Sequence, residues 1–213
     1  MLTIYHISTS KLGSFREDRH HKVVVAMPSI NMPMALRAAD VMMRRTEQPG
    51  LLLVIEDDLR LGFIMTANLA YARTQSDYFA YVAQDAFPGH LWLDYGLDTM
   101  KRCGAGLLAF NEGSFFGKVA AFGLVHRDWT RSLYRNFLFY PQYKSHYADV
   151  ELSVLALHTS NLAFNPNAIL MEVDFEKHLK NSQNKEDALL YTQRAESGFD
   201  GRMPPFTPAT FQT

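Results

Sequence analysis

The stretch Tyr78-Phe-Ala-Tyr-Val-Ala-Gln-Asp85-Ala-Phe-Pro-Gly89 decides the fold that we expect for this chain. Tyr78–Ala83 is typical of a buried strand, and the strand stops at a carboxylate that a Pro-Gly turn follows closely. In an open α/β sheet, ligands bind outside the carboxyl ends of the strands. A carboxylate at that place can hold a hard cation, and the cation can hold a phosphate. Taken alone, Asp85 equally fits a residue that opens a turn or caps a helix.

Apolar runs on either side repeat this pattern and alternate with segments of helical spacing. Besides Tyr78–Ala83, strands are predicted at Thr3–Ile7, Val23–Met27, Leu51–Ile55, Gly106–Phe110, Lys118–Val125 and Ile169–Val173. Helices are predicted at about residues 35–43, 63–73, 90–102 and 185–194. Such alternation favours βαβ units, so the sequence predicts an α/β fold with a mainly parallel central sheet and flanking helices.

A second pair of carboxylates follows the predicted strand Leu51–Ile55. Asp57 and Asp58 come just after this strand, as Asp85 comes after the next one. Because right-handed crossovers collect the carboxyl ends of parallel strands at one edge, these carboxylates are expected to face one crevice. The first strand is followed by no Gly-x-Gly-x-x-Gly fingerprint and no P-loop, which disfavours both Rossmann dinucleotide binding and P-loop hydrolysis.

Composition limits the remaining classes of function. The 213 residues carry a formal net charge of -1 and are 47% hydrophobic, which fits one globular domain. The near-neutral charge makes nucleic acid an unexpected partner. Cys103 is the only cysteine, so no disulfide forms within the chain. Neither a signal peptide nor an apolar run long enough to span a bilayer is present, and we expect a cytoplasmic protein.

A further candidate site lies in Tyr147-Ala-Asp149-Val-Glu151, which reads as the start of a helix. Asp149 and Glu151 are separated by about 200° around a helix of 3.6 residues per turn, so both cannot face one small site. Asp149 can point along the axis towards a crevice and is the preferred general base, with Glu151 the other catalytic candidate. The alternative is that Asp149 is an N-cap and Glu151 a solvated charge.

The order of these features resembles the GT-A type glycosyltransferases, especially family-2-like nucleotide-sugar transferases. The resemblance rests on Val23–Pro28, Leu53–Asp58, Phe79–Ala86 and Tyr147–Glu151, and it covers about residues 22–180. It implies a Rossmann-like GT-A fold in a single domain over residues 1–213, with residues 181–213 forming a peripheral helix and a tail. Where the family usually carries two carboxylates, Gln84-Asp85-Ala86 has one, and Gln84 offers only a neutral oxygen.

The resemblance also implies roles for individual residues. The nucleotide sugar would lie against Pro28, Asp57, Asp58, Gln84, Asp85 and Arg127. A Mn²⁺ or Mg²⁺ ion would be held by Asp85 and by His178, which lies where some members place a late metal-binding histidine. Trp129 would face the acceptor, although anchoring in the core is an alternative for this residue.

The resulting prediction is a glycosyltransferase that moves a sugar from a nucleoside diphosphate donor to a hydroxyl acceptor. With Asp149 as the base, the reaction is expected to be metal-assisted and inverting. The incomplete Asp-x-Asp motif supports an alternative, a non-catalytic nucleotide-sugar-binding or scaffold protein. A nucleotidyltransferase ranks last, because Pro28–Pro33 contains no glycine.

Overall fold

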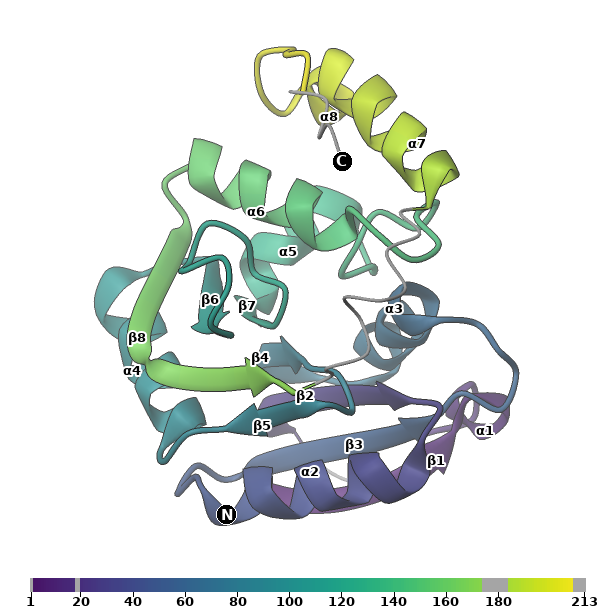
Figure 1. Cartoon of the computed structure of the whole chain (residues 1–213), viewed down its shortest axis with the longest axis vertical. Coiled ribbons are helices and arrows are strands. Elements are labelled where there is room, and N and C mark those ends of the chain that lie inside the picture. Colours follow the sequence, from purple (N-terminus) through teal and green to yellow (C-terminus); the bar gives the residue numbers. More distant parts are fainter. Residues whose placement is uncertain (1, 18–19, 174–183, 209–213) are drawn as a thin grey trace.

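The computed structural model describes residues 2–17, 20–173 and 184–208, and it has the predicted α/β architecture (Figure 1). The strands are β1 Leu2–Ser8, β2 His21–Ser29, β3 Gly50–Glu56, β4 Ser76–Tyr81, β5 Ala86–Pro88, β6 Leu107–Asn111, β7 Gly123–His126 and β8 Leu162–Glu172. The helices are α1 Thr9–Leu12, α2 Met32–Arg44, α3 Phe63–Arg73, α4 Trp92–Cys103, α5 Arg127–Tyr134, α6 Ala148–His158, α7 Lys185–Glu196 and α8 Gly198–Gly201.

The strands follow the order β1-β3-β2-β4-β7-β6-β8-β5 across the sheet. Strands β1, β3, β2 and β4 pair in parallel, and β6 pairs in parallel with β8. Strand β7 runs antiparallel to both β4 and β6, and β5 runs antiparallel to β8. The prediction of a mainly parallel sheet with flanking helices is therefore confirmed, with antiparallel β7 set between its two parallel halves.

The direction of β7 decides which loops share an edge. Two antiparallel pairings in succession make β6 parallel to β4, so the carboxyl ends of β2, β3, β4 and β6 lie at one edge. We call this the carboxyl edge. Strand β7 begins there, with Gly123 opposite Tyr81, and ends at the opposite edge, with His126 opposite Tyr78.

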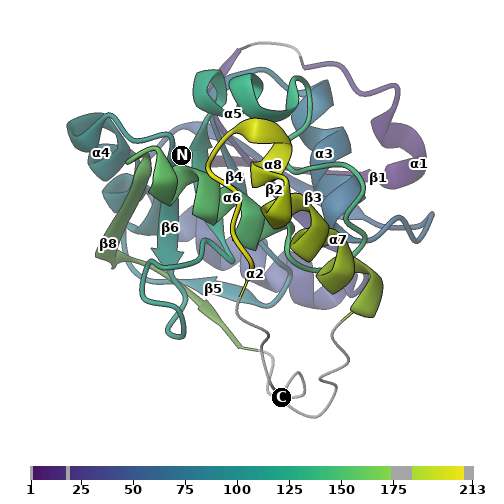
Figure 2. The ribbon, with the colours of Figure 1, turned by 90° about the horizontal axis from the view of Figure 1, so that it is seen from above.

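Helices cover both faces of the sheet, which explains why β2 and β3 read as continuous apolar runs. One face packs against α3, α5, α6 and α7 through buried residues such as Tyr71, Tyr134 and Leu152. The other face packs against α2 and α4 through residues such as Met42 and Trp92. In Figures 1 and 2, α7 and α8 lie outside α6 and form the outermost layer of the first face.

The helix expected at residues 185–194 forms as α7, which lies in the outermost layer and packs its inner side on the rest of the fold. Its side chains Asp187, Tyr191, Arg194 and Ala195 are buried. Two other expectations change in extent. Only the end of Lys118–Val125 forms a strand, β7, and the expected strand and turn at Asn161–Pro166 join the strand expected at Ile169–Val173 in one bent strand, β8. Strand β5 was not predicted, because this short strand pairs with β8, which lies far along the chain.

Candidate functional site

Three loops meet at the carboxyl edge, and Gln84 connects two of them. Its side-chain oxygen accepts hydrogen bonds from the Ser29 hydroxyl (2.8 Å) and from the backbone N–H groups of Ile30 (2.9 Å) and Asn31 (2.8 Å). This single oxygen thus holds the loop between β2, which ends just after the buried Pro28, and α2. Gln84 fixes the shape of the predicted nucleotide loop, which is a bracing role that the sequence did not indicate.

Asp57 and Asp58 likewise accept hydrogen bonds from the protein itself. The backbone N–H groups of Leu61 (2.8 Å) and Gly62 (2.7 Å) donate to the buried Asp57 carboxylate and so close the loop between β3 and α3. The exposed Asp58 carboxylate accepts from the Thr9 hydroxyl (2.6 Å) and from the backbone N–H of Ser10 (3.0 Å). Both residues shape the carboxyl edge, and direct contact with a nucleotide stays a prediction for them.

The Asp58 contacts make the attachment of α1 dependent on pH. Hydrogen bonds from Ser10 and Thr9 lower the pKa of Asp58 to about 2. Because the pKa is lower in the folded chain than in the unfolded one, the attachment is complete above pH ~4 and is lost as the pH falls through about 2. An NMR titration of the Asp58 carboxyl should give this low midpoint, and Asp58→Asn should speed amide exchange at Ser10. A midpoint near 4 would show that the contacts do not persist in solution.

Asp85 lies at the centre of the carboxyl edge. It lies in the turn after β4, which ends at Tyr81, and comes directly before β5. It is 6% exposed, and its backbone oxygen accepts a hydrogen bond from Val173 N–H (3.0 Å), just after the end of β8. This backbone contact holds the Asp85 segment beside the end of β8, and the role of its carboxylate stays a prediction.

Asp149 reaches the same edge from α6. The Tyr81 hydroxyl, at the end of β4, donates to Ala120 O (2.7 Å), and the N–H of Ala120 donates to Ser153 Oγ (2.9 Å). The Ser153 hydroxyl in turn donates to Asp149 O (2.6 Å), at the first turn of α6. Burial, and after it the charge of Asp149, raise the pKa of Tyr81 well above its ordinary value. The half-buried Asp149 therefore lies beside the end of β4, as Asp85 does.

Glu112 is a further carboxylate at this edge, and it is not among the residues predicted from the sequence. It follows β6 directly and is 4% exposed. One of its oxygens accepts from the backbone N–H groups of Ser114 (2.8 Å) and Phe115, whereas its buried Oε2 has no hydrogen-bond partner in the described parts of the chain. Its place after a buried strand, like that of Asp85, was the signal that could have found it.

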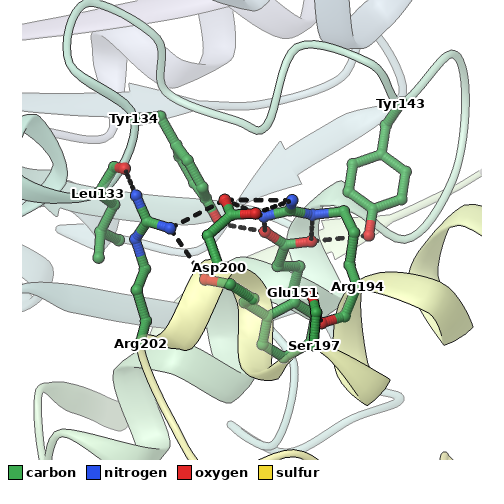
Figure 3. A network of polar contacts seen from close by, with 9 residues as sticks. Leu133, Tyr134, Tyr143, Glu151, Arg194, Ser197, Asp200 and Arg202 are labelled. Carbon is green, nitrogen blue, oxygen red and sulfur yellow. Dashed lines mark hydrogen bonds and ion pairs between the residues drawn. The ribbon is translucent and has the colours of Figure 1, made fainter.

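Glu151 is not at the crevice, so its assignment as a catalytic candidate is wrong. Its fully buried carboxylate accepts hydrogen bonds from the hydroxyls of Tyr134 (2.6 Å) and Tyr143 (2.7 Å) (Figure 3). Arg194 of α7 donates to it twice, from Nε and from the second terminal nitrogen, at 2.7 Å each, and also pairs with Asp200. All these donors are protein groups, and Glu151 therefore joins α6 to α7.

The pKa values within this cluster reflect the buried charge. Burial, and then the charge and hydrogen bonds of Glu151, raise the pKa of Tyr134 and of Tyr143 well above the ordinary value of tyrosine. Burial alone would lower the pKa of Arg194, but the hydrogen bonds and charge of Glu151, with Asp200, raise it overall. The cluster thus holds Arg194 between the carboxylates of Glu151 and Asp200, together with two neutral tyrosines.

Helix α7 also fixes the loop that precedes α6. Asp187, which is 1% exposed, accepts hydrogen bonds from the backbone N–H groups of Lys144 (3.0 Å), Ser145 (2.7 Å) and His146 (2.8 Å). This loop leads directly to Asp149. Helix α7 therefore positions the first turn of α6 through Asp187, which holds the preceding loop, and through Arg194, which holds Glu151.

Arg127 and Trp129 follow the end of β7 and therefore lie at the edge opposite Asp85, which corrects both assignments. The Arg127 guanidinium is buried and donates to Ser76 Oγ (3.0 Å), Tyr71 O (2.9 Å) and Thr74 Oγ1. Burial lowers the pKa of Arg127 to about 10. Trp129 packs its ring over Gly106, where a Cβ would lie 2.3 Å from the indole. Both side chains anchor α5 beneath the sheet.

Of the two predicted metal ligands, Asp85 lies at the carboxyl edge, and His178 lies outside the described residues. Within residues 2–17, 20–173 and 184–208, no three His, Cys, Asp or Glu side chains gather closely enough to hold a metal ion. A single carboxylate such as Asp85 suits a cation that takes most of its ligands from a bound diphosphate, since Mg²⁺ commonly binds through one or two carboxylates and substrate phosphates.

The described helices include none with the length and apolar character needed to cross a membrane.

Comparison with known proteins adds information on the fold. No protein-family model matches the sequence, and no significant match was found among curated proteins. The structure is similar to mannosyltransferase PcManGT from Pyrobaculum calidifontis, solved with GDP-Man and Mn²⁺, with a TM-score of 0.62 and 15% identity over 91% of this chain and 67% of that one.

Two further solved structures are similar. Drosophila β-1,4-galactosyltransferase 7, solved with manganese, UDP-Gal and xylobiose, gives a TM-score of 0.58 and 16% identity over 79% of each chain. TarS from S. aureus gives a TM-score of 0.51 and 8% identity over 84% of this chain and 72% of that one. At such low identity the likeness concerns the fold, and this chain has the GT-A fold of these glycosyltransferases.

Proposed function

We propose that this protein transfers a sugar from a nucleoside diphosphate donor to a hydroxyl acceptor, with inversion at the anomeric carbon. The observation that carries the proposal is the placement of Asp85, after β4, and Asp149, at the start of α6, at one edge of a GT-A sheet. The similar structures were solved with GDP-Man and UDP-Gal, which supports a donor of this class.

In this proposal the two carboxylates divide the chemistry. Asp85 would hold a divalent cation, Mn²⁺ or Mg²⁺, against the diphosphate, and the cation supplies Lewis-acid stabilisation of the departing charge when bound. Asp149 accepts the proton of the acceptor hydroxyl as its oxygen bonds to the anomeric carbon. The bond from that carbon to the phosphate oxygen breaks, and its electron pair leaves with the nucleoside diphosphate.

The rest of the edge orders the donor loops. Gln84 holds the β2–α2 loop, and Asp57 closes the β3–α3 loop, so both loops are shaped before a nucleotide arrives. Preorganised loops reduce the ordering entropy that a ligand must overcome on binding.

Thermal stability against nucleotides tests the donor site. Because a ligand of the native state raises the melting temperature, UDP or GDP species with Mn²⁺ should raise it, and EDTA should reverse the effect. Mn²⁺ alone should give little shift, since Asp85 offers one carboxylate. Asp85→Asn should remove the metal-dependent part, whereas Asp77→Asn, an exposed control, should not. No shift with any nucleotide under any metal condition would contradict the proposal.

A second candidate is a nucleotide-sugar-binding or scaffold protein without turnover. It is favoured by the single carboxylate in Gln84-Asp85-Ala86 and by the use of Gln84 as a brace. A nucleotide-sugar shift of the melting temperature, with no release of nucleotide in the presence of an acceptor panel, would select this candidate.

A further inference from the structure

The loop between β6 and β7 crosses the carboxyl edge and is held at both ends. At its start, Glu112 accepts hydrogen bonds from the backbone N–H groups of Ser114 and Phe115. Near its end, Ala120 accepts from the Tyr81 hydroxyl and donates to Ser153 of α6. The loop is thus fixed to the strand that leads to Asp85 and to the helix that carries Asp149.

The tip of this loop presents two aromatic side chains to solvent. Phe115 is 47% exposed and Phe116 is 67% exposed. Phe116 has a φ of 48°, a left-handed conformation that bulky residues seldom adopt and that occurs preferentially at functional positions. Gly117 follows with a φ of 82°, and a Cβ there would lie 2.5 Å from the Phe164 ring. A turn that holds two phenylalanines outward in this way is difficult to explain as core packing.

Strand β8 extends the apolar surface towards Asp85. Met171 is 43% exposed, and its methyl carbon would lie 2.8 Å from a Cβ added to Gly113 of the loop. Val173 is 40% exposed, and its N–H donates to the backbone oxygen of Asp85. We refer to Phe115, Phe116, Met171 and Val173 as the apolar rim. Met171 lies beside Gly113 of the loop, and Val173 contacts Asp85, so these two residues connect the loop to the proposed donor site.

We propose that the acceptor is an amphiphile, with its hydroxyl at Asp149 and an alkyl portion against the apolar rim. This inference rests on the proposed function and names the acceptor class. Phe115 and Phe116 offer flat rings, but Met171 and Val173, which lead from the loop to Asp85, offer neither a ring for stacking on a sugar nor a hydrogen-bonding group. The part of the rim beside the proposed site therefore matches hydrocarbon better than a second saccharide. Exposed apolar side chains that gather beside a proposed active site favour an interaction surface over ordinary scattered exposure.

The test compares two glycosides with the same head. Binding of n-octyl and methyl glycosides of glucose, galactose and mannose is measured by calorimetry, with the octyl compounds kept monomeric and the nucleotide that raised the melting temperature present. The wild-type protein should bind at least one octyl glycoside about tenfold or more tightly than its methyl counterpart, since each buried methylene adds to affinity.

A double variant, Phe115→Ser with Phe116→Asn, should lose most of this preference and keep the nucleotide-induced melting shift. Asn tolerates the left-handed conformation at position 116, so the loop is preserved. The control Leu189→Ser replaces a residue of α7 that is 60% exposed and lies outside the rim, and it should keep the preference.

The outcomes separate the two proposals. Equal affinity for octyl and methyl glycosides, in a protein whose nucleotide shift is intact, would overturn the amphiphile proposal alone. Loss of the octyl preference in Leu189→Ser as well would also overturn the amphiphile proposal, because the preference would then not depend specifically on the apolar rim. Absence of any nucleotide shift would instead be a failure of the donor site. Flotation with phosphatidylcholine vesicles that depends on Phe115 and Phe116, without an octyl preference, would replace the acceptor with a membrane surface.

Discussion

Arg194→Met should destabilise the fold by about 3 to 5 kcal/mol, because it leaves the Glu151 carboxylate buried without its cation. Glu151 is fully buried, and Arg194 is its only charged partner within hydrogen-bonding distance in the described parts of the chain. In a chain of this size each kcal/mol lowers the melting temperature by roughly 2 to 4 °C, so a fall of about 6 to 20 °C is expected. Chemical denaturation, with the free energy of unfolding taken from the midpoint, provides the measurement.

Two matched variants sharpen this test. Arg131→Met removes an exposed ion pair with Asp128 and should change the free energy of unfolding by no more than about 1 kcal/mol. Combining Arg194→Met with Glu151→Leu should recover part of the lost stability, since no unpaired charge is then buried. If Arg194→Met were as stable as Arg131→Met, Glu151 would not depend on this ion pair, and its structural assignment would be wrong.

Asp149→Asn should reduce the rate of sugar transfer by about 10² to 10⁴, the usual contribution of a general base. The amide keeps the shape of the carboxylate but cannot accept the proton of the acceptor hydroxyl. The nucleotide-induced melting shift should remain, because Asp85 and the donor loops are unchanged. The measurement is the rate of nucleotide release from the donor that the melting assay identifies, with an acceptor that supports turnover in the wild-type protein.

The control for this variant is Asp128→Asn, whose side chain is 77% exposed on α5 at the opposite edge. It should retain the wild-type rate. A rate within a few-fold of wild type for Asp149→Asn would remove Asp149 as the base and reopen a retaining mechanism. A large loss of stability in Asp149→Asn would instead assign the residue to the N-terminal structure of α6.

Local sequence was sufficient for most of the elements, because their burial leaves a pattern in the chain. Strands β2 and β3 are covered on both faces and read as unbroken apolar runs. Helix α3, over Phe63–Arg73, has the bounds that the sequence predicts. The strand expected at Tyr78–Ala83 forms as β4, and the turn expected after it contains Asp85.

The direction of β7 could not be predicted from its own residues. A short apolar strand has the same pattern whether it runs parallel or antiparallel to its neighbours, so Arg127 and Trp129 were expected beside Asp85. In the structure, β7 runs antiparallel to β4 and carries both residues to the opposite edge. There the buried Arg127 donates hydrogen bonds to the end of α3, to Thr74 and to the start of β4.

The sequence by itself thus determined the α/β class and the parallel half of the sheet, because these depend on residues that are close together in the chain. It also predicted Asp85 and Asp149 as site residues, which remains a prediction. Only the tertiary structure decided that Glu151 is an anchor and that Glu112 lies at the candidate site. The partner of Glu151 is Arg194, which is 43 residues away along the chain, and Glu112 reaches the edge only because β6 runs parallel to β4. Contacts between residues that are distant in the chain leave no periodic pattern in a single sequence, so the roles of Glu151 and Glu112 are visible only in the folded structure.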